Sequence, residues 1–215
     1  MDTKITIVYD NCLKKRELKT GWGFSALIET NHTPPILFDT GNDGVALLYN
    51  MEKLGIDPKL ISAIVISHGH YDHTGGLVDI FSVNKHAIIY LPASATTTIP
   101  GREVITVSKP LQIAGSVFST GELKNIEQSL AIKTSRGILV ITGCSHPGVG
   151  TILDAASNLG EIYGLLGGLH GFSDFSRLNG LSIICPCHCT QYKKDLASRF
   201  PEQYVECGAG FELVI

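Results

Sequence analysis

Short apolar runs alternate with polar turns rich in glycine along the whole chain. Such runs between turn signals are typical of buried strands, and longer stretches with helical spacing predict helices. The pattern predicts strands at residues 5–9, 22–29, 36–38, 63–66, 87–91, 129–133, 137–141, 162–166, 181–184, 204–206 and 211–214, with short strands between 103 and 121. It predicts helices at about 43–54, 77–83 and 149–159, one ending near 199, and a short one at Pro58. Strands that lead through turns into helices indicate an α/β protein.

The composition indicates one globular domain over residues 1–215. Hydrophobic residues make up 44% of the 215 and charged residues only 17%, which favours a sizeable core over disorder. A net charge of −3 without a basic block argues against nucleic acid or an anionic membrane as partner, and no apolar run could span a bilayer. The first residues predict a strand, not an export signal, so the six cysteines are expected to be reduced in the cytoplasm. We expect a small-molecule substrate, and the sequence leaves the oligomeric state open.

One turn carries four candidate metal ligands, His68, His70, Asp72 and His73. It follows the apolar run 63–66, so it lies at the carboxyl end of a strand, where α/β sheets bind ligands. Imidazole nitrogen and carboxylate oxygen suit zinc, manganese and iron. His68 and His70 can point at one ion, and Asp72 and His73 can face a second.

Glycines in the same turn are expected to serve its geometry. Gly69 is expected to adopt backbone angles that a side chain would forbid, and Gly75 and Gly76 to let the backbone pass close to the site.

Three further turns after predicted strands carry His146, His170 and His188. Together, four strand-end turns hold six of the eight histidines. Because such turns meet at one edge of an α/β sheet, we expect these side chains to converge on one site. The loop at 93–101, with three threonines at 96–98, is either a substrate contact or a plain exposed loop.

Asp39 and the cysteines each allow two interpretations. Asp39, after the strand at 36–38, either caps the helix that begins near Asp43 or orients a metal-bound histidine through its carboxylate. Cys185, Cys187 and Cys189 alternate along the chain, which favours small buried residues over a zinc ribbon. A cysteine ligand, including Cys144 near His146, is the alternative.

Several segments resemble the metallo-β-lactamase fold superfamily. The His68-x-His70-x-Asp72-His73 run looks like the signature of that family. The resemblance narrows to a subgroup of archaeal 7,8-dihydropterin-6-methyl-4-(β-D-ribofuranosyl)aminobenzene 5′-phosphate synthases through the segments 21–29, 37–41, 67–76, 142–148, 167–170 and 188–190. It implies a four-layer αββα sandwich, in which two mixed sheets are flanked by helices.

The resemblance also implies roles for the ligands. His68, His70 and His146 would hold a first divalent metal, and Asp72, His73 and His188 a second, with zinc expected and manganese or iron as alternatives. Asp39 would support a metal-bound histidine.

The chain departs from the family pattern in one turn. Many two-metal members carry a bridging aspartate there, but residues 167–171 offer His170 and no carboxylate. His170 would bind metal, bind a substrate anion or donate a proton, and Asp174 could supply a carboxylate if the chain folds back.

The resulting hypothesis is a metal-dependent hydrolase with one or two metals per chain. Asp72 would orient the water or carry its proton, and His170 would act on the substrate or leaving group. The substrate would be a small molecule bearing a phosphate or carboxylate. One alternative is a transferase that displaces pyrophosphate from a dihydropterin pyrophosphate; another is a metal-binding protein without turnover.

Overall fold

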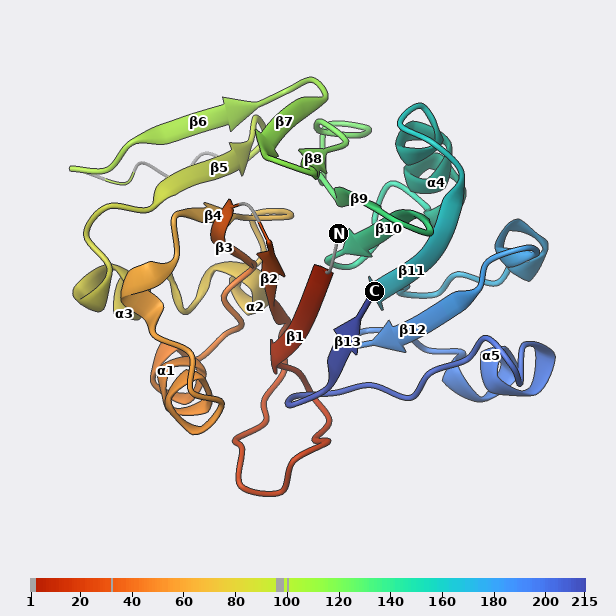
Figure 1. The fold of residues 1–215 in the computed structure, drawn as a ribbon, viewed down its shortest axis with the longest axis horizontal. Coiled ribbons are helices and arrows are strands. Elements are labelled where there is room, and N and C mark those ends of the chain that lie inside the picture. The colour runs from red at the N-terminus through yellow and green to blue at the C-terminus, as the bar shows by residue number, and fades with distance from the viewer. Residues whose placement is uncertain (1–2, 32, 96–98, 100) are drawn as a thin grey trace.

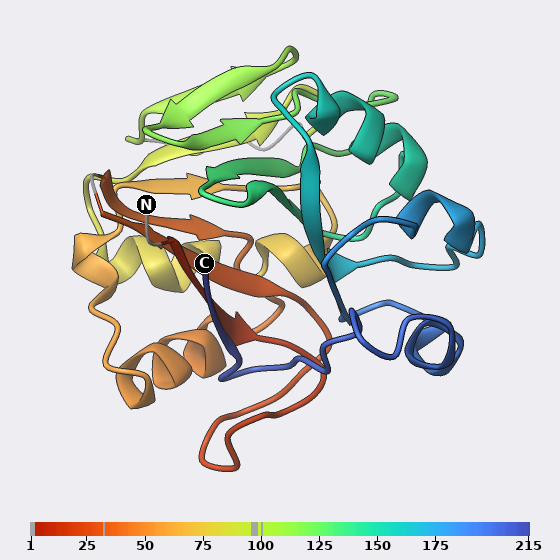
Figure 2. The same cartoon turned by 45° about the vertical axis from the view of Figure 1, so that its right-hand side comes forward.

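Two mixed β-sheets pack face to face, and helices cover both outer faces, in the computed structural model of the chain (Figures 1 and 2). The structure describes residues 3–31, 33–95, 99 and 101–215. Residues 96–98, the threonines of the loop at 93–101, therefore lie outside the described part. The arrangement is the four-layer αββα sandwich that the family resemblance implies.

The first sheet has the strand order β13-β1-β2-β3-β4-β5-β6. Its strands are β1 Thr3–Tyr9, β2 Ser25–Thr30, β3 Thr33–Phe38, β4 Ala63–Val65, β5 Ile88–Pro92, β6 Val104–Val107 and β13 Glu212–Val214. The pairs from β3 to β6 are parallel and those from β13 to β3 antiparallel. The last strand of the chain therefore lies beside the first (Figure 1).

The second sheet has the order β12-β11-β10-β9-β8-β7. Its strands are β7 Leu111–Ala114, β8 Val117–Ser119, β9 Leu130–Thr134, β10 Gly137–Thr142, β11 Ile162–Gly168 and β12 Ile183–Cys187. The strands β10, β11 and β12 are parallel to one another. Both sheets thus contain parallel strands whose carboxyl ends carry the predicted ligand turns.

Helices cover the outer face of each sheet. They are α1 Gly44–Lys53, α2 Tyr71–Thr74, α3 Leu77–Val83, α4 Val149–Ser157 and α5 Lys193–Arg199, with 3-10 turns η1 Pro58–Leu60 and η2 Phe175–Leu178. Side chains of α1 and α3 pack with the first sheet, and those of α4 and α5 with the second (Figure 1).

Successive side chains of a strand point to opposite faces of its sheet, which explains why the molecule has one apolar core between the sheets and one under the helices on each side. In β4, Ala63 and Val65 join the core between the sheets, whereas Ile64 joins the core under α1 and α3. In β10, Leu139 and Val140 divide in the same way between the middle core and the core under α4. Strands covered on both faces read as continuous apolar runs, which is why the sequence revealed them.

Several predicted boundaries differ from the observed ones: the strand expected at 22–29 begins at Ser25, and the strand expected at 181–184 is Ile183–Cys187. Two further differences are more informative. Residues 204–206 form no strand, since Tyr204 makes only an isolated bridge to Ile184. Pro34 and Pro35, predicted as part of a turn, belong to β3. This part of β3 pairs only with β2, because β4 joins from Ile36 onward, so the missing proline N–H groups interrupt no ladder there.

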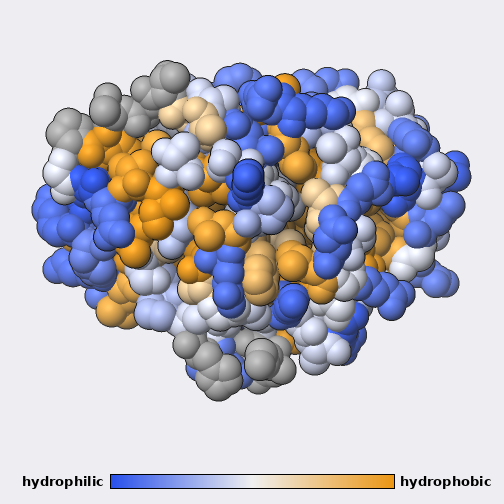
Figure 3. All heavy atoms as spheres, turned by 90° about the horizontal axis from the view of Figure 1, so that it is seen from above, coloured by the Kyte–Doolittle hydropathy of each residue, from blue (hydrophilic) through white to orange (hydrophobic). Residues whose placement is uncertain are grey.

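Seen from above, hydrophobic patches are separated by hydrophilic residues on the face that the picture shows (Figure 3). Within the described residues, no helix combines the length and hydrophobicity that a bilayer span needs.

Candidate metal centre

The predicted ligands converge where the two sheets meet. His68, His70, Asp72 and His73 follow β4 in the first sheet. His146, His170 and His188 follow β10, β11 and β12 in the second. The side chains from the two sheets form groups of possible metal ligands at this edge.

One group consists of His68, His70 and His146. Their donor atoms all lie within 4.8 Å of one another. His68 is buried, His146 is half-buried and His70 is exposed, so the group opens to solvent on one side. It is the trio predicted to hold the first metal.

The second group contains Asp72, His73 and His188, together with Cys144. Asp72 Oδ2 lies 3.2 Å from His188 Nε2 and 3.6 Å from His73 Nε2. Cys144 Sγ lies 3.2 Å from His73 Nε2. The structure thus brings together the trio predicted for the second metal and adds a sulfur to it.

In three histidines the Nδ1 atom lies within hydrogen-bond distance of a neighbouring polar side chain. Nδ1 lies 2.7 Å from Asp39 Oδ2 in His73, 2.9 Å from Ser67 Oγ in His68 and 3.0 Å from Asn11 Oδ1 in His188. If each Nδ1 carries the proton, each Nε2 is left as the ligand atom, which is how outer partners orient metal-bound histidines.

Asp39 contacts His73 and Ser67 and is not the cap of α1. Its carboxylate is fully buried and accepts hydrogen bonds from the Ser67 N–H and Oγ as well as from His73. The cap of α1 is Asp43, whose side chain accepts from Ala46 N–H. The capping interpretation of Asp39 is therefore wrong.

Glu127, which the sequence analysis missed, holds the turn of His146. Its buried carboxylate accepts hydrogen bonds from four consecutive backbone N–H groups, those of residues 143–146, and from Thr142 Oγ1. The next residue, Gln128, donates from its side chain to the carbonyls of Ile66 and Tyr90 in the first sheet. Two adjacent residues thus connect the ligand turns of the two sheets. Only the tertiary fold reveals this, because their partners are distant in sequence.

Three of the four histidine turns contain a non-glycine residue with left-handed φ, and Asp39 is a further example. Among the described non-glycine residues with left-handed φ are Asp39, Ser145, His170 and His188, with φ of 59°, 61°, 46° and 47°. Such angles are uncommon outside glycine and persist where the surroundings enforce them. The Glu127 carboxylate is one enforcing contact, since it binds the N–H of Ser145.

The expectations for the glycines are half right. Gly69 has no left-handed φ, and a Cβ added there would meet nothing closer than Ala95 Cβ at 3.8 Å, so the predicted special backbone angle is wrong. Gly75 and Gly76 do sit in close backbone approaches. A Cβ would lie 2.5 Å from the Asn42 carbonyl oxygen at Gly75 and 2.3 Å from that of Thr40 at Gly76.

His170 belongs to neither of the two ligand trios that the sequence predicts. It is exposed, and its ring centroid lies 5.1 Å from that of His146. Both histidines line a cavity of about 320 Å³ together with Leu169 and Phe172. Asp174 is exposed and bonded to Ser176 Oγ, and it joins none of the described ligand groups. His170 is thus placed to meet a molecule in that cavity.

The cysteines divide between core and site. Cys185 and Cys187 lie in the core between the sheets, as the alternation predicts. Cys189 is buried beyond the end of β12, with its Sγ 3.3 Å from Cys144 Sγ, and the two form a third ligand group with His170. This contact raises the pKa of the Cys144 thiol and lowers that of Cys189 to about 5.

The electrostatics favour neutral imidazoles at His68 and His146 and an ionised carboxylate at Asp72, but they act in the opposite sense at His73. Burial and the neighbouring imidazoles hold the pKa of His68 well below its usual range, and burial lowers that of His146. Burial acts to raise the pKa of Asp72, but His188 and His73 lower it overall. Burial would lower the pKa of His73 as well, yet the Asp39 carboxylate raises it.

The donor set fits a divalent metal. His146 Nε2 and His188 Nε2 are buried without a hydrogen-bond partner, although the latter lies near Asp72. An unpaired buried polar nitrogen is costly unless a ligand such as an ion satisfies it. Nitrogen, carboxylate and thiol donors together suit zinc or iron.

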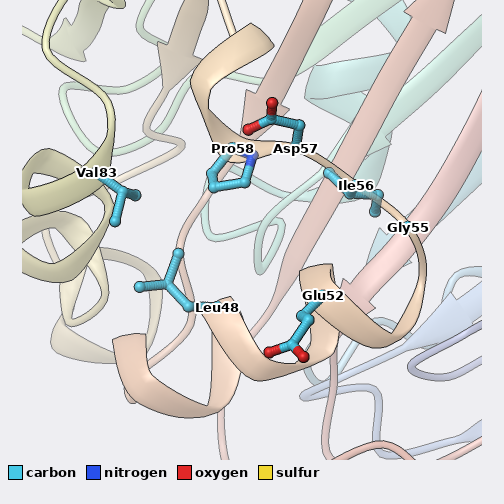
Figure 4. Close-up of a pocket in the computed structure, with 7 residues that line it drawn as sticks. All are labelled: Leu48, Glu52, Gly55, Ile56, Asp57, Pro58 and Val83. Carbon is cyan, nitrogen blue, oxygen red and sulfur yellow. The ribbon is translucent and has the colours of Figure 1, made fainter.

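Another cavity lies at the other end of the first sheet. It has a volume of about 460 Å³ and is lined by Leu48, Glu52, Gly55, Ile56, Asp57, Pro58 and Val83 (Figure 4). These residues lie in α1, at the last residue of α3 and in the segment that leads to β4, whereas the ligands follow the end of β4. We therefore assign this cavity no part in the metal centre.

Comparisons with known proteins agree with this geometry. Residues 21–158 match the model of the Metallo-beta-lactamase superfamily. The chain is 28% identical to 7,8-dihydropterin-6-methyl-4-(beta-D-ribofuranosyl)-aminobenzene-5'-phosphate synthase of Methanocaldococcus jannaschii, over 86% of this chain and 85% of that protein. It is 32% identical to an uncharacterized protein of the same organism, over 88% of this chain and 91% of that protein. The crystal structure of Tm1679, a metal-dependent hydrolase of the beta-lactamase superfamily, superimposes with a TM-score of 0.80 at 27% identity and covers 99% of both chains.

Proposed function

Because the chain belongs to the metallo-β-lactamase superfamily, we propose that it is a metal-dependent hydrolase of a small anionic molecule. The observation that carries the proposal is the convergence of two ligand trios beside an open cavity. Likeness to a structure described as a metal-dependent hydrolase supports the same reaction class.

Different residues of the chain would bind the metal ions and orient the water. His68, His70 and His146 would hold one ion, and Asp72, His73 and His188 the other. Divalent ions held there would supply Lewis acidity and a coordinated water whose pKa falls toward about 7. Asp72, half-buried beside His188 and His73, would orient that water or carry its proton.

His170 would act on the substrate. Its exposed ring at the cavity shared with His146 could bind an anionic group or donate a proton to the leaving group. The cavity has the size of a small-molecule site, and apolar side chains such as Leu169 and Phe172 would hold the uncharged part. A phosphate or carboxylate on the substrate would face the ions. A cytoplasmic location is part of this proposal, supported by the six free thiols.

A second candidate is a transferase that releases pyrophosphate from a dihydropterin pyrophosphate. The similarity to the synthase of M. jannaschii over most of both chains favours it. Divalent ions held by the same residues would supply the binding of the pyrophosphate group, and the entering group would be an aryl carbon instead of water. Pyrophosphate release that requires both substrates would identify this reaction.

The test is a double variant, His68→Ala with His70→Ala, compared with His86→Ala. His86 is exposed and belongs to no described ligand group. Metal content and hydrolysis of phosphoesters, pyrophosphates and carboxylic esters would be measured on metal-loaded protein. We expect the double variant to lose metal and activity, while His86→Ala keeps both. Full activity and metal content in the double variant would refute the proposal.

A further inference from the structure

Cys144 occupies the position of a fourth ligand in the second metal group. Its Sγ lies 3.2 Å from His73 Nε2, and the donor atoms of Asp72, His73, Cys144 and His188 all lie within 4.8 Å of one another. The side chain is almost fully buried, with an exposed fraction of 3%. The sulfur therefore faces the ligand group and not the solvent.

The separations suit a tetrahedral ion. With bonds of about 2.0 Å to nitrogen or oxygen and about 2.3 Å to sulfur, neighbouring ligand atoms lie roughly 3.3–3.6 Å apart. In this structure the pairs Cys144–His73, Asp72–His188 and Asp72–His73 are separated by 3.2, 3.2 and 3.6 Å. Small adjustments of these four side chains would seat an ion among them.

Charge gives a second argument. The turn at 167–171 carries no carboxylate, so Asp72 is the only anionic ligand in the predicted trio. A thiolate beside it would bring the ligand charge to that of a divalent cation, which favours binding in a buried site. Cys189 is less well placed, because its donor atom groups with Cys144 and His170 and not with Asp72, His73 and His188.

We propose that Cys144 is the fourth ligand of the second metal and that this position selects zinc or iron(II) over manganese. On binding, the thiol S–H bond breaks, the proton leaves to solvent and a sulfur–metal bond forms, so no oxidant or reductant is needed. Thiolate ligands favour zinc and iron, whereas manganese prefers oxygen. The inference rests on the proposed metal centre but not on the reaction that it performs.

Cobalt(II) is the probe, because a thiolate ligand adds a charge-transfer absorption in the near ultraviolet to the visible bands of the ion. Metal-free wild-type protein would be titrated with cobalt(II) while bound metal is counted by equilibrium dialysis. Cys144→Ala and the nearly isosteric Cys144→Ser are the test variants. Cys189→Ala is a neighbouring control, and Cys185→Ala removes a buried thiol of the core between the sheets.

We expect the charge-transfer band in the wild type, Cys189→Ala and Cys185→Ala, and its loss in both Cys144 variants, with one ion fewer bound. Cobalt bound without that band, or a band that survives in the Cys144 variants, overturns the inference and leaves the metal centre intact. Failure to bind any cobalt overturns both the inference and the proposed function. If neither Cys144 variant folds, X-ray absorption of zinc-loaded wild type decides, since a shell without sulfur contradicts the assignment.

Discussion

Asp39 Oδ2 lies 2.7 Å from His73 Nδ1, and both side chains are completely removed from solvent. This contact aims His73 Nε2 at Asp72 and Cys144. Asp39→Asn keeps the shape but removes the charge and one acceptor oxygen. Outer partners of this kind contribute about 10–100-fold to metal affinity, so we expect a loss in that range at the second metal. Competition with a chromophoric chelator measures it.

Asp43→Asn is the matched control for Asp39→Asn. It changes the same functional group at the cap of α1, where asparagine caps as well as aspartate. An equal loss of affinity in both variants would mean that the effect is one of general charge and not of the contact with His73.

Glu127→Gln should loosen the turn of His146. The carboxylate accepts from the N–H groups of residues 143–146, and an amide nitrogen in place of one oxygen would face donors. We expect a loss of about 2 kcal/mol or more in the free energy of unfolding, because hydrogen bonds to charged groups contribute roughly 1.5–3 kcal/mol each. Denaturant unfolding of the metal-free protein measures it. Glu161→Gln, at an exposed position, should be neutral, and a similar stability of the two variants would contradict the role of Glu127.

His68 should make the metal-free protein less stable in acid. Its pKa in the fold lies well below the ordinary 6.5, so below that pH the unfolded chain takes up a proton that the folded chain does not. Stability therefore falls as the pH drops through about 6.5, by up to about 1.4 kcal/mol per pH unit for one proton. His73 acts in the opposite sense, because its pKa is raised. Unfolding of wild type and His68→Gln at several pH values isolates the His68 contribution, and identical pH slopes would refute it.

Gly76→Ala and Gly69→Ala should differ sharply, although both lie in the same ligand turn. A Cβ at Gly76 would be 2.3 Å from the Thr40 carbonyl oxygen, whereas at Gly69 the nearest atom is 3.8 Å away. Forcing the backbone segments apart typically costs about 1–3 kcal/mol. We expect Gly76→Ala to lose stability in that range and Gly69→Ala to stay within about 0.5 kcal/mol of wild type in thermal unfolding. A destabilised Gly69→Ala would show that this position is constrained after all.

Oxidation should join Cys144 to Cys189 in the metal-free protein. Their sulfurs are 3.3 Å apart and must approach to about 2.05 Å, while the two hydrogens pass to an added oxidant such as an azodicarboxamide. Peptide mapping would identify the disulfide, and bound zinc should slow its formation by holding the Cys144 sulfur. Equal rates with and without zinc would contradict that protection.

Local pattern was sufficient to predict an α/β protein and the histidine turns, whereas the four-layer sandwich came from the resemblance to the family. Ala63 to Ile66 read as a strand because both faces of β4 are covered, and the ligands followed directly. Glu127 was missed because its partners lie 15 to 19 residues away and no local feature of the sequence marks the contact. The capping assignment of Asp39 failed for a similar reason, since Asp43 lies at the helix start and Asp39 turns inward to Ser67 and His73.

Each ligand trio contains residues that follow strands of both sheets, so an ion bound by a trio would link the two sheets. His68 and His70 meet His146 across the junction, just as Asp72 and His73 meet His188. An ion bound at either position would therefore oppose sliding of one sheet over the other. The affinity for that ion would in turn depend on how the two sheets are packed against each other. We therefore expect that a mutation in the apolar layer between the sheets, far from any ligand, would change the affinity for metal by shifting the ligand turns of the two sheets relative to each other.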